Sequence, residues 1–507
     1  MNNSSTQAPN TKGCSTPQML TYSLGECANS LVMNGIFGFA MLFYTKSLGL
    51  DPRWAGFAMS LSVFWEAISE PIMGHVSDNT RGSWGRRHPY MLVGGLLMAL
   101  CSYLIWTVPS SLRGQEWTIL ETQIPLVFLY LVVMNLLLRT GLTMFFIPYM
   151  ALGFEMCTDY QGRSRLQGIR QIFNMAANFA GPAMAWVFFF GGEKGKAQAT
   201  SVEANYHHMG ATFAIATAFF VIVVVALTFR WREDTRNLVR ESKDGWLKDF
   251  FTDMKLIVLD PNPRWVFAFI FIVCVGMVVV SSLQMYVYDD FMNFPSWQKS
   301  IAHGSTMIGM AIGAALSVGF AKKFDKKGAV LIGGGLSIFA NSMLGVLFLT
   351  GLVKPDAALA IGSTTVPVAL ILFVLFHASY WLGNGILLPI STAMMADVSE
   401  VHLLRTGVNK DGGYSSVFSL AMRMAIAFSL VLVGYCLDGI GYKVPGEGQA
   451  AVIQTPETIW LLGMVTFIVG SLIALAALLS ILKYPITFRR LEEIRAECGA
   501  KSDASNG

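Results

Sequence analysis

Long apolar stretches recur along almost the entire chain and restrict its fold more than any other feature. A helix that crosses a lipid bilayer needs about 20 mainly apolar residues. Hydrocarbon offers no hydrogen bonds to the backbone, so each spanning stretch must be helical. Of the 507 residues, 54% are hydrophobic and 13% are charged. The sequence therefore predicts an all-α integral membrane protein with twelve transmembrane helices, at about 20–48, 53–77, 89–109, 124–155, 165–191, 208–230, 264–289, 300–322, 328–352, 366–397, 413–438 and 457–482.

Basic residues are distributed unequally between the two sets of loops. Of the 36 Lys and Arg residues, 25 fall on the side of the termini, 8 on the other side and 3 within spans. Because cytoplasmic loops carry the excess of basic residues, both termini are predicted to be cytoplasmic. The predicted parts are an N-terminal tail at 1–18, a six-helix half at 19–230, a cytoplasmic central loop at 231–263, a second six-helix half at 264–483 and a C-terminal tail at 484–507.

Loop patterns recur at a nearly constant offset and indicate two related halves. Asp78 and the basic cluster after it recur 247 residues later as Asp325, followed by two lysines. A second set recurs 241 or 242 residues later: Pro148, Glu155 and Arg163 become Pro389, Asp397 and Arg405. Parallel duplication of a six-helix half is typical of the major facilitator fold, which binds its substrate near the midplane between the halves.

Two glutamates, Glu66 and Glu70, lie near the middle of the second predicted span. Their four-residue spacing places both carboxylates on one helix face. A charge at the bilayer centre costs about 3 kcal/mol or more, so the pair must face a polar cavity, a cation or a basic partner. A buried acid pair that precedes a short basic loop favours a cation-coupled transporter; here the loop carries Asp78, Arg81, Arg86 and Arg87.

Two stretches, Trp65 to Pro89 and PYMALGFEMCTDYQGRSRLQGIR at 148–170, carry a resemblance to a known family. The chain resembles the glycoside–pentoside–hexuronide:cation symporters, the melibiose permease group, over nearly all of its length. The resemblance implies a cation site at Glu66, Ser69, Glu70 and Thr143. Glutamates here replace the family's aspartates, and a serine replaces its asparagine. Oxygen ligands suit Na⁺, and a pair of long carboxylates can also share a proton, so both ions stay open.

Three arginines lie within predicted spans. Arg170 matches a family arginine near the sugar and cation sites, and Arg423 falls where the family has a lysine. Arg139 has no family counterpart and lies one turn from Thr143. An alternative to the cation site is an internal salt bridge from the glutamates to Arg139 or Arg170. Three arginines against two glutamates leave a charge of +1, which predicts an anionic substrate such as a uronide.

The positions that match the family's sugar pocket carry no acid. They are Ser30 or Asn29, Phe146, Met150 and Leu388, which disfavours simple galactosides. Other polar or stacking contacts could come from Asn34, His377, Tyr380, Trp381 and Asn384. The predicted substrate-binding set is Ser30, Asn34, Arg139, Phe146, Met150, Arg170, His377, Trp381 and Arg423.

Charged residues in the cytoplasmic loops are interpreted as gating residues, which cap helix ends and form ion pairs. They are Asp78, Arg86, Arg87, Glu155, Arg163, Asp325, Asp397 and Arg405.

These features predict a cation-coupled secondary symporter in the cell inner membrane that moves an organic solute, such as a glycoside, oligosaccharide or uronide. An amphiphile or lysolipid transporter of the same fold is the alternative, and a non-transporting sensor is a further one. No phosphate-binding loop or catalytic constellation is recognised in the sequence, so neither ATP-driven transport nor enzyme activity is predicted. The expected partners are the solute, Na⁺ or H⁺ and membrane lipid, with no cofactor, no nucleic acid and a monomeric protein.

Overall fold

The computed structural model describes most of the chain. The described residues are 15–119, 121–157, 160–191, 199–231, 255, 257, 263–361, 364–407, 410–446 and 452–506. The predicted central loop at 231–263 lies almost entirely outside them, as does most of the predicted N-terminal tail at 1–18.

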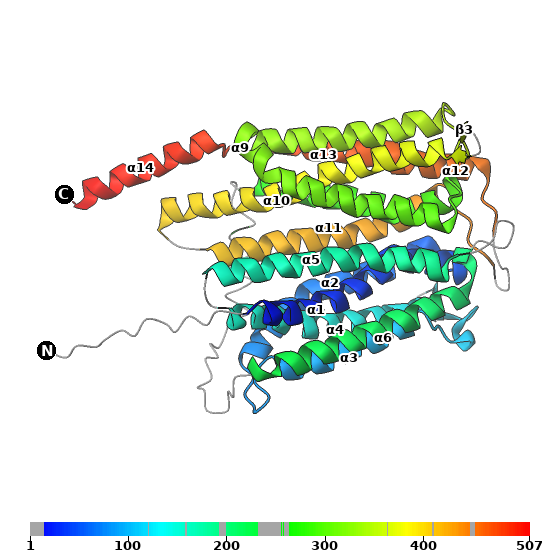
Figure 1. The fold of residues 1–507 in the computed structure, drawn as a ribbon, viewed down its shortest axis with the longest axis horizontal. Coiled ribbons are helices and arrows are strands. Elements are labelled where there is room, and N and C mark those ends of the chain that lie inside the picture. Colours follow the sequence, from blue (N-terminus) through cyan, green and yellow to red (C-terminus); the bar gives the residue numbers. More distant parts are fainter. Residues whose placement is uncertain are drawn as a thin grey trace. The chain divides into compact units, whose positions relative to one another are not determined.

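Helices make up almost all of the described structure (Figure 1), and the predicted all-α class is confirmed. Of the helices described, eight are long and apolar enough to cross a membrane. The α-helices are α1 (Thr16–Gly35), α2 (Pro52–Asp78), α3 (His88–Leu104), α4 (Leu126–Met156), α5 (Tyr160–Met184), α6 (Glu203–Thr228), α8 (Arg264–Tyr286), α9 (Ser296–Leu349), α10 (Val368–Thr406), α11 (Asp411–Gly439), α12 (Pro456–Met464), α13 (Gly470–Ile481) and α14 (Phe488–Asn506).

Short π-helical and 3₁₀ segments extend several of these helices. The π-helical segments are η1 (Ile36–Ala40), η2 (Phe43–Ser47), η4 (Ala185–Phe189), η7 (Val287–Phe291) and η8 (Val465–Val469). The 3₁₀ segments are η3 (Ser110–Leu112), η5 (Ala199–Ser201) and η6 (Phe229–Trp231). Several of the π-helical segments lie at or near the ends of long apolar helices, where they extend the span.

A bend divides α9 into two limbs. Asp325 has φ 62° and ψ 164°, outside the helical region, and its Oδ1 accepts the backbone N–H of Lys326 at 2.7 Å. The limbs correspond to the two separate predicted spans at 300–322 and 328–352. Figure 1 shows the limbs as two long green helices that meet at the bend, with α10 in yellow beside them.

Two short antiparallel hairpins, which the sequence did not predict, lie between helices. One pairs β1 (Glu116–Ile119) with β2 (Thr122–Pro125), and the other pairs β3 (Leu359–Ile361) with β4 (Thr364–Val366). Their Thr, Ile, Val and Trp residues favour strands. The first hairpin precedes α4 and the second precedes α10, and their first residues are 243 positions apart (359 − 116). This offset matches the loop repeat.

The chain divides into two compact units. Unit 1 comprises Met1–Phe37, Trp65–Pro182 and Ala204–Ser242, and unit 2 comprises Gly38–Phe64, Ala183–Glu203 and Lys243–Gly507. The segments 38–64 and 183–203 come from the predicted N-terminal half but pack in unit 2. The predicted division into six-helix halves at 231–263 stays a prediction.

Aromatic packing fixes α1 against α4 in unit 1. The rings of Tyr22 and Tyr149 stack with centroids 4.4 Å apart. Each hydroxyl donates to the other residue's carbonyl oxygen, at 2.8 and 3.2 Å. A Cβ on Gly25 would lie 2.5 Å from the Tyr149 ring, so glycine permits this close approach. The contact orients the next turns of α1, which carry Glu26 and Ser30.

Glycines bring the first limb of α9 against α10 in unit 2. A Cβ on Gly309 would lie 2.2 Å from the Ala378 carbonyl oxygen, and one on Gly313 would lie 2.0 Å from that of Leu382. Each contact is repeated four residues later on both helices, so the two run in parallel. Side chains on the turns of α9 that precede these glycines can therefore come close to side chains of α10.

Candidate functional site

A buried ion pair joins α2 to α4. Glu66 Oε2 lies 2.6 Å from Arg139 Nη1, and each residue is 1% exposed. Met33 Sδ of α1 lies 3.4 Å from Nη1, and the Phe37 ring of the adjoining η1 lies 5.3 Å from the guanidinium carbon. The mid-span glutamate thus has a basic partner, and of the two arginines considered it is Arg139.

Two hydroxyls continue this face by one helical turn. Ser69 Oγ lies 3.1 Å from Thr143 Oγ1 and donates to the carbonyl oxygen of Glu66 at 3.2 Å. Both hydroxyl residues are buried, whereas Glu70, on the same helix, is half-buried. The structure therefore brings together Glu66, Ser69 and Thr143 of the predicted cation set and adds Arg139. Within the described part of the chain, no three His, Cys, Asp or Glu side chains form a metal-ligand group.

A polar ladder joins α1 to α5. Arg170 Nε lies 2.9 Å from Glu26 Oε1. Asn174 Nδ2 donates to Glu26 Oε2 at 3.2 Å and to Ser30 Oγ at 3.0 Å. Asn178 Nδ2 donates to Asn174 Oδ1 at 2.9 Å and Oδ1 of Asn178 accepts from Asn34 at 2.6 Å. On each helix, successive members of the ladder are four residues apart, so they lie on one face and make that face polar.

Three members of the ladder, Glu26, Asn174 and Asn178, were not predicted. The signal that could have found them is the shared period, 26/30/34 on one helix and 170/174/178 on the other. Glu26 is 3% exposed, and it corrects the charge sum. Adding Glu26 to the residues of that sum gives three arginines and three carboxylates, so 3 − 3 leaves no net positive charge. The charge sum therefore no longer supports an anionic substrate, and the preference for a uronide stays a prediction.

The other predicted substrate positions are distributed over both units. In unit 1, Met150 Sδ lies 2.5 Å from Arg170 Nη1, and Phe146 packs beside Tyr149. In unit 2, His377 and Trp381 are buried on α10, and Arg423 is half-buried on α11.

Unit 2 contains a buried charged cluster that the sequence did not predict. Lys46 of η2 contacts both Asp289 and Asp290 of η7, the latter at 2.8 Å. Lys299 and Thr200 also contact Asp289, and the Tyr442 hydroxyl donates to Asp290 at 2.6 Å. Two ammonium groups thus neutralise two carboxylates, all at most 8% exposed. We call these four charged residues the ion cluster.

The predicted gating residues form pairs within each unit. Arg87 Nη2 lies 2.6 Å from Asp78 and 2.9 Å from Glu155, and Arg86 lies 3.0 Å from Glu155. The side chain of Arg163 lies outside the description. The basic loop therefore ties the end of α2 to the end of α4.

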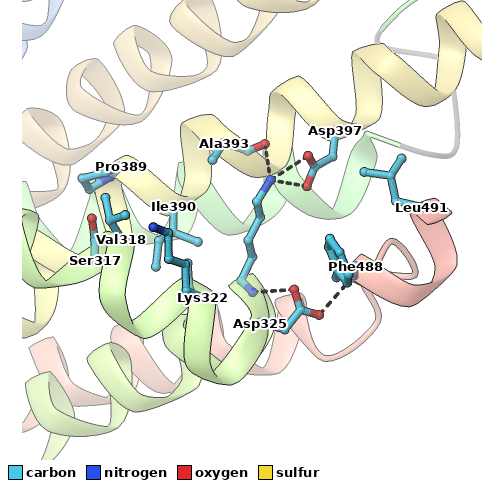
Figure 2. A pocket seen from close by; sticks show the side chains of 12 residues that line it. Ser317, Val318, Lys322, Asp325, Pro389, Ile390, Ala393, Asp397, Phe488 and Leu491 are labelled. Carbon is cyan, nitrogen blue, oxygen red and sulfur yellow. Dashed lines mark hydrogen bonds and ion pairs between the residues drawn. The ribbon is translucent and has the colours of Figure 1, made fainter.

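The corresponding segment of the repeat in unit 2, at the bend of α9, is tied to α10 by an ion pair. Lys326 Nζ lies 2.6 Å from the Asp397 carboxylate and 3.2 Å from the Ala393 carbonyl oxygen (Figure 2). Lys326 rather than Arg405 contacts the Asp397 carboxylate in this arrangement, and Arg405 is exposed. Asp325 Oδ2 accepts the backbone N–H of Phe488 at 3.3 Å. It therefore holds the start of α14 against a mostly apolar pocket, which Phe488 and Leu491 help to line.

Buried ion pairs and a polar ladder between helices apolar enough to span a membrane are typical of substrate and ion pathways in multi-span membrane proteins. The family model described as MFS/sugar transport protein matches residues 21–488, so the chain belongs to this family. The predicted resemblance to the glycoside–pentoside–hexuronide:cation symporters is confirmed. The family is one of transporters and not of enzymes.

Relatives and solved structures match over most of the chain. The glucuronide carrier protein homolog of Escherichia coli (strain K12) is 24% identical over 94% of each chain. The isoprimeverose transporter of Lactiplantibacillus pentosus is 25% identical, covering 86% of this chain and 82% of the relative. The inward open structure of the xylose transporter of E. coli has a TM-score of 0.59 at 15% identity and covers 94% of this chain and 98% of its own. The last similarity shows the fold.

Proposed function

We propose that the protein is a cation-coupled symporter for a sugar-type solute, working by alternating access with twelve spans and cytoplasmic termini in a cell inner membrane. The observation that carries the proposal is the buried Glu66–Arg139 pair and its hydroxyl neighbours. Buried charge is retained against a cost of several kcal/mol per ion. A fold that needed only stability would do as well with apolar side chains at these positions.

The proposed cation site consists of Glu66, Ser69, Glu70 and Thr143. Two carboxylates and the Arg139 guanidinium carry one net negative charge, which a single Na⁺ or H⁺ would neutralise. In the present arrangement the guanidinium contacts Glu66. Binding of the ion then requires Arg139 to share or release that carboxylate. Because one cation would replace one guanidinium at the Glu66 carboxylate, we expect one cation to bind in each transport cycle.

The proposed substrate site is the polar ladder on α1 and α5. Its amides, carboxylate and guanidinium offer both donors and acceptors, which fits hydroxyl groups better than a single anion. The names of the relatives, which include a glucuronide carrier and an isoprimeverose transporter, support a sugar-type solute. Met33, which contacts Arg139, directly precedes Asn34 of the ladder. Helix α1 therefore touches both proposed sites and provides a route for coupling them.

The proposed gating rests on the two kinds of ion-pair clusters. The pairs of Asp78, Arg87 and Glu155, and of Lys326 and Asp397, lie at or near ends of predicted spans on the predicted cytoplasmic side. The ion cluster lies at the opposite helix ends and joins segment 38–64 to η7 and α9. Alternating access requires one set to loosen while the other holds.

Uptake into proteoliposomes tests the proposal. The panel contains neutral glycosides, their uronic-acid counterparts and a lysolipid, with Na⁺ and pH gradients imposed separately. We expect gradient-driven accumulation of a glycoside, its loss in Glu70→Gln, and no loss in Glu457→Gln, a control at an exposed glutamate of α12. Accumulation of the lysolipid alone would support the amphiphile alternative. Absence of any gradient-driven uptake would contradict the proposal.

A further inference from the structure

A buried polar and aromatic cluster occupies unit 2 between α8, α9 and α10. His377 Nε2 lies 3.0 Å from Gln284 Oε1 and 3.1 Å from the Tyr288 hydroxyl. Lys299, one turn before His303 on α9, contacts Asp289, which directly follows Tyr288, so His303 lies on the face of α9 that is turned toward this cluster. Trp381 follows His377 by one turn, and all five residues are at most 6% exposed. None of these residues belongs to the ion cluster, although Asp289 directly follows Tyr288 and Lys299 lies one turn before His303.

Four polar atoms of this cluster have no hydrogen-bond partner among the described residues. They are both ring nitrogens of His303, Nδ1 of His377 and Nε1 of Trp381. A buried donor or acceptor without a partner costs about 1–3 kcal/mol, and native proteins leave few such groups. Four in one cluster are therefore a feature that stability alone does not explain.

The unpaired atoms comprise both donors and acceptors in equal number. The contact of His377 Nε2 with the Gln284 oxygen places the proton on Nε2, which leaves Nδ1 as an acceptor. A neutral His303 ring supplies one donor and one acceptor, and the Trp381 indole supplies one donor. A carboxylate or phosphate would use only the donors, and an ammonium group only the acceptors. A hydroxyl both donates and accepts, so hydroxyl groups satisfy this set best.

Aromatic rings lie beside the rings of His377 and Trp381. The Phe373 ring lies 5.1 Å from the His377 ring, the Tyr380 ring stacks on it at 6.4 Å, and the Trp381 ring lies 5.4 Å from that of Tyr380. Apolar ring faces beside hydroxyl-binding groups match the two kinds of surface that a neutral sugar ring presents.

We infer that His303, His377 and Trp381 form a subsite in unit 2 that binds hydroxyl groups of a neutral sugar-type solute. The inference rests on the proposed function and deepens it, because it assigns a substrate class to a cluster in the C-terminal part of the chain. It also adds His303, Gln284 and Tyr288, which the sequence did not single out.

Binding to the purified full-length protein in nanodiscs tests the subsite, with methyl hexopyranosides, methyl pentopyranosides, their deoxy analogues and methyl glucuronide as probes. We expect His303→Leu and His377→Leu to weaken binding of the best neutral glycoside at least tenfold. The control His208→Leu, at an exposed position of α6, should leave it unchanged. His303→Gln, which keeps one donor and one acceptor, should retain more affinity than His303→Leu.

The thermal midpoint of the ligand-free protein separates a binding role from a structural one. Removal of unpaired atoms should leave the midpoint of His303→Leu unchanged or raise it, whereas removal of a structural hydrogen bond would lower it. Unchanged glycoside affinity in both leucine variants would show that the cluster holds ordered water only and would overturn the subsite, while the proposed function stands. If the unmutated protein binds no glycoside, both fail. If His303→Leu does not fold, His303→Gln decides by the same comparison.

Discussion

Replacement of Glu66 by glutamine should both destabilise the protein and uncouple transport. The change leaves the Arg139 guanidinium, 1% exposed, without its carboxylate. Removal of one partner of a buried ion pair costs about 3–5 kcal/mol. At about 2.1 cal/mol/K per residue, unfolding of the whole chain has an entropy of about 1 kcal/mol/K. The midpoint should therefore fall by about 3–5 °C, and by more if unit 1 unfolds alone.

A double variant separates stability from coupling. Glu66→Gln with Arg139→Met removes both charges, and replacement of a buried pair by uncharged side chains is often nearly neutral. Its thermal midpoint should return to within about 1 °C of the unmutated protein. Uphill uptake should stay absent, because the cation site still lacks a carboxylate.

The assays are thermal unfolding in detergent and gradient-driven uptake by proteoliposomes, with Glu457→Gln as the matched control. If the double variant is as unstable as Glu66→Gln, the ion pair is not the source of the effect. If it accumulates solute uphill, Glu66 and Arg139 form only a structural lock and the proposed cation site is wrong.

Three further perturbations test the other clusters. Glu26→Gln removes a charged acceptor of the polar ladder, whose hydrogen bonds are worth about 1.5–3 kcal/mol. The Kd for a neutral glycoside, measured by equilibrium binding, should rise about 10- to 100-fold, and an unchanged Kd would exclude Glu26 from the substrate site. Lys46→Met leaves Asp289 short of a partner and should raise maleimide labelling of a cysteine introduced at Ser296; equal labelling with and without the change would remove the ion cluster from the gate. Asp78→Asn weakens a half-exposed pair worth about 0–1 kcal/mol and should modestly increase labelling of a cysteine at Met150 from the cytoplasmic side, whereas no increase would contradict that gate.

Hydropathy predicted where the helices lie because the bilayer restricts both length and composition of a span. The two limbs of α9 also follow two predicted spans, although a bend at Asp325 and not a loop separates them. The hairpins before α4 and α10 were missed, since four-residue strands beside an apolar helix give no separate periodic signal.

Pairing between helices was less accessible from the sequence. The need of Glu66 for a partner follows from its depth, but the choice between Arg139 and Arg170 depends on helix rotation, which a sequence without homologues does not give. Glu26 lies only six residues into the predicted span at 20–48, where a charge is expected to reach water, and in the structure it is buried beside Arg170 and Asn174 of α5. The members of the ion cluster likewise come from separate segments at span ends, so their burial is a tertiary property.

The number of charges moved with each solute tests the central claim most directly. Reversal potentials of proteoliposomes, measured with a neutral glycoside and an imposed gradient of Na⁺ or H⁺, give the cation-to-solute ratio. The net negative charge of Glu66, Glu70 and Arg139 predicts one cation for each solute molecule, and a ratio of zero in Glu66→Gln. Solute flux that moves no charge in the unmutated protein, or a ratio of two, would contradict the account.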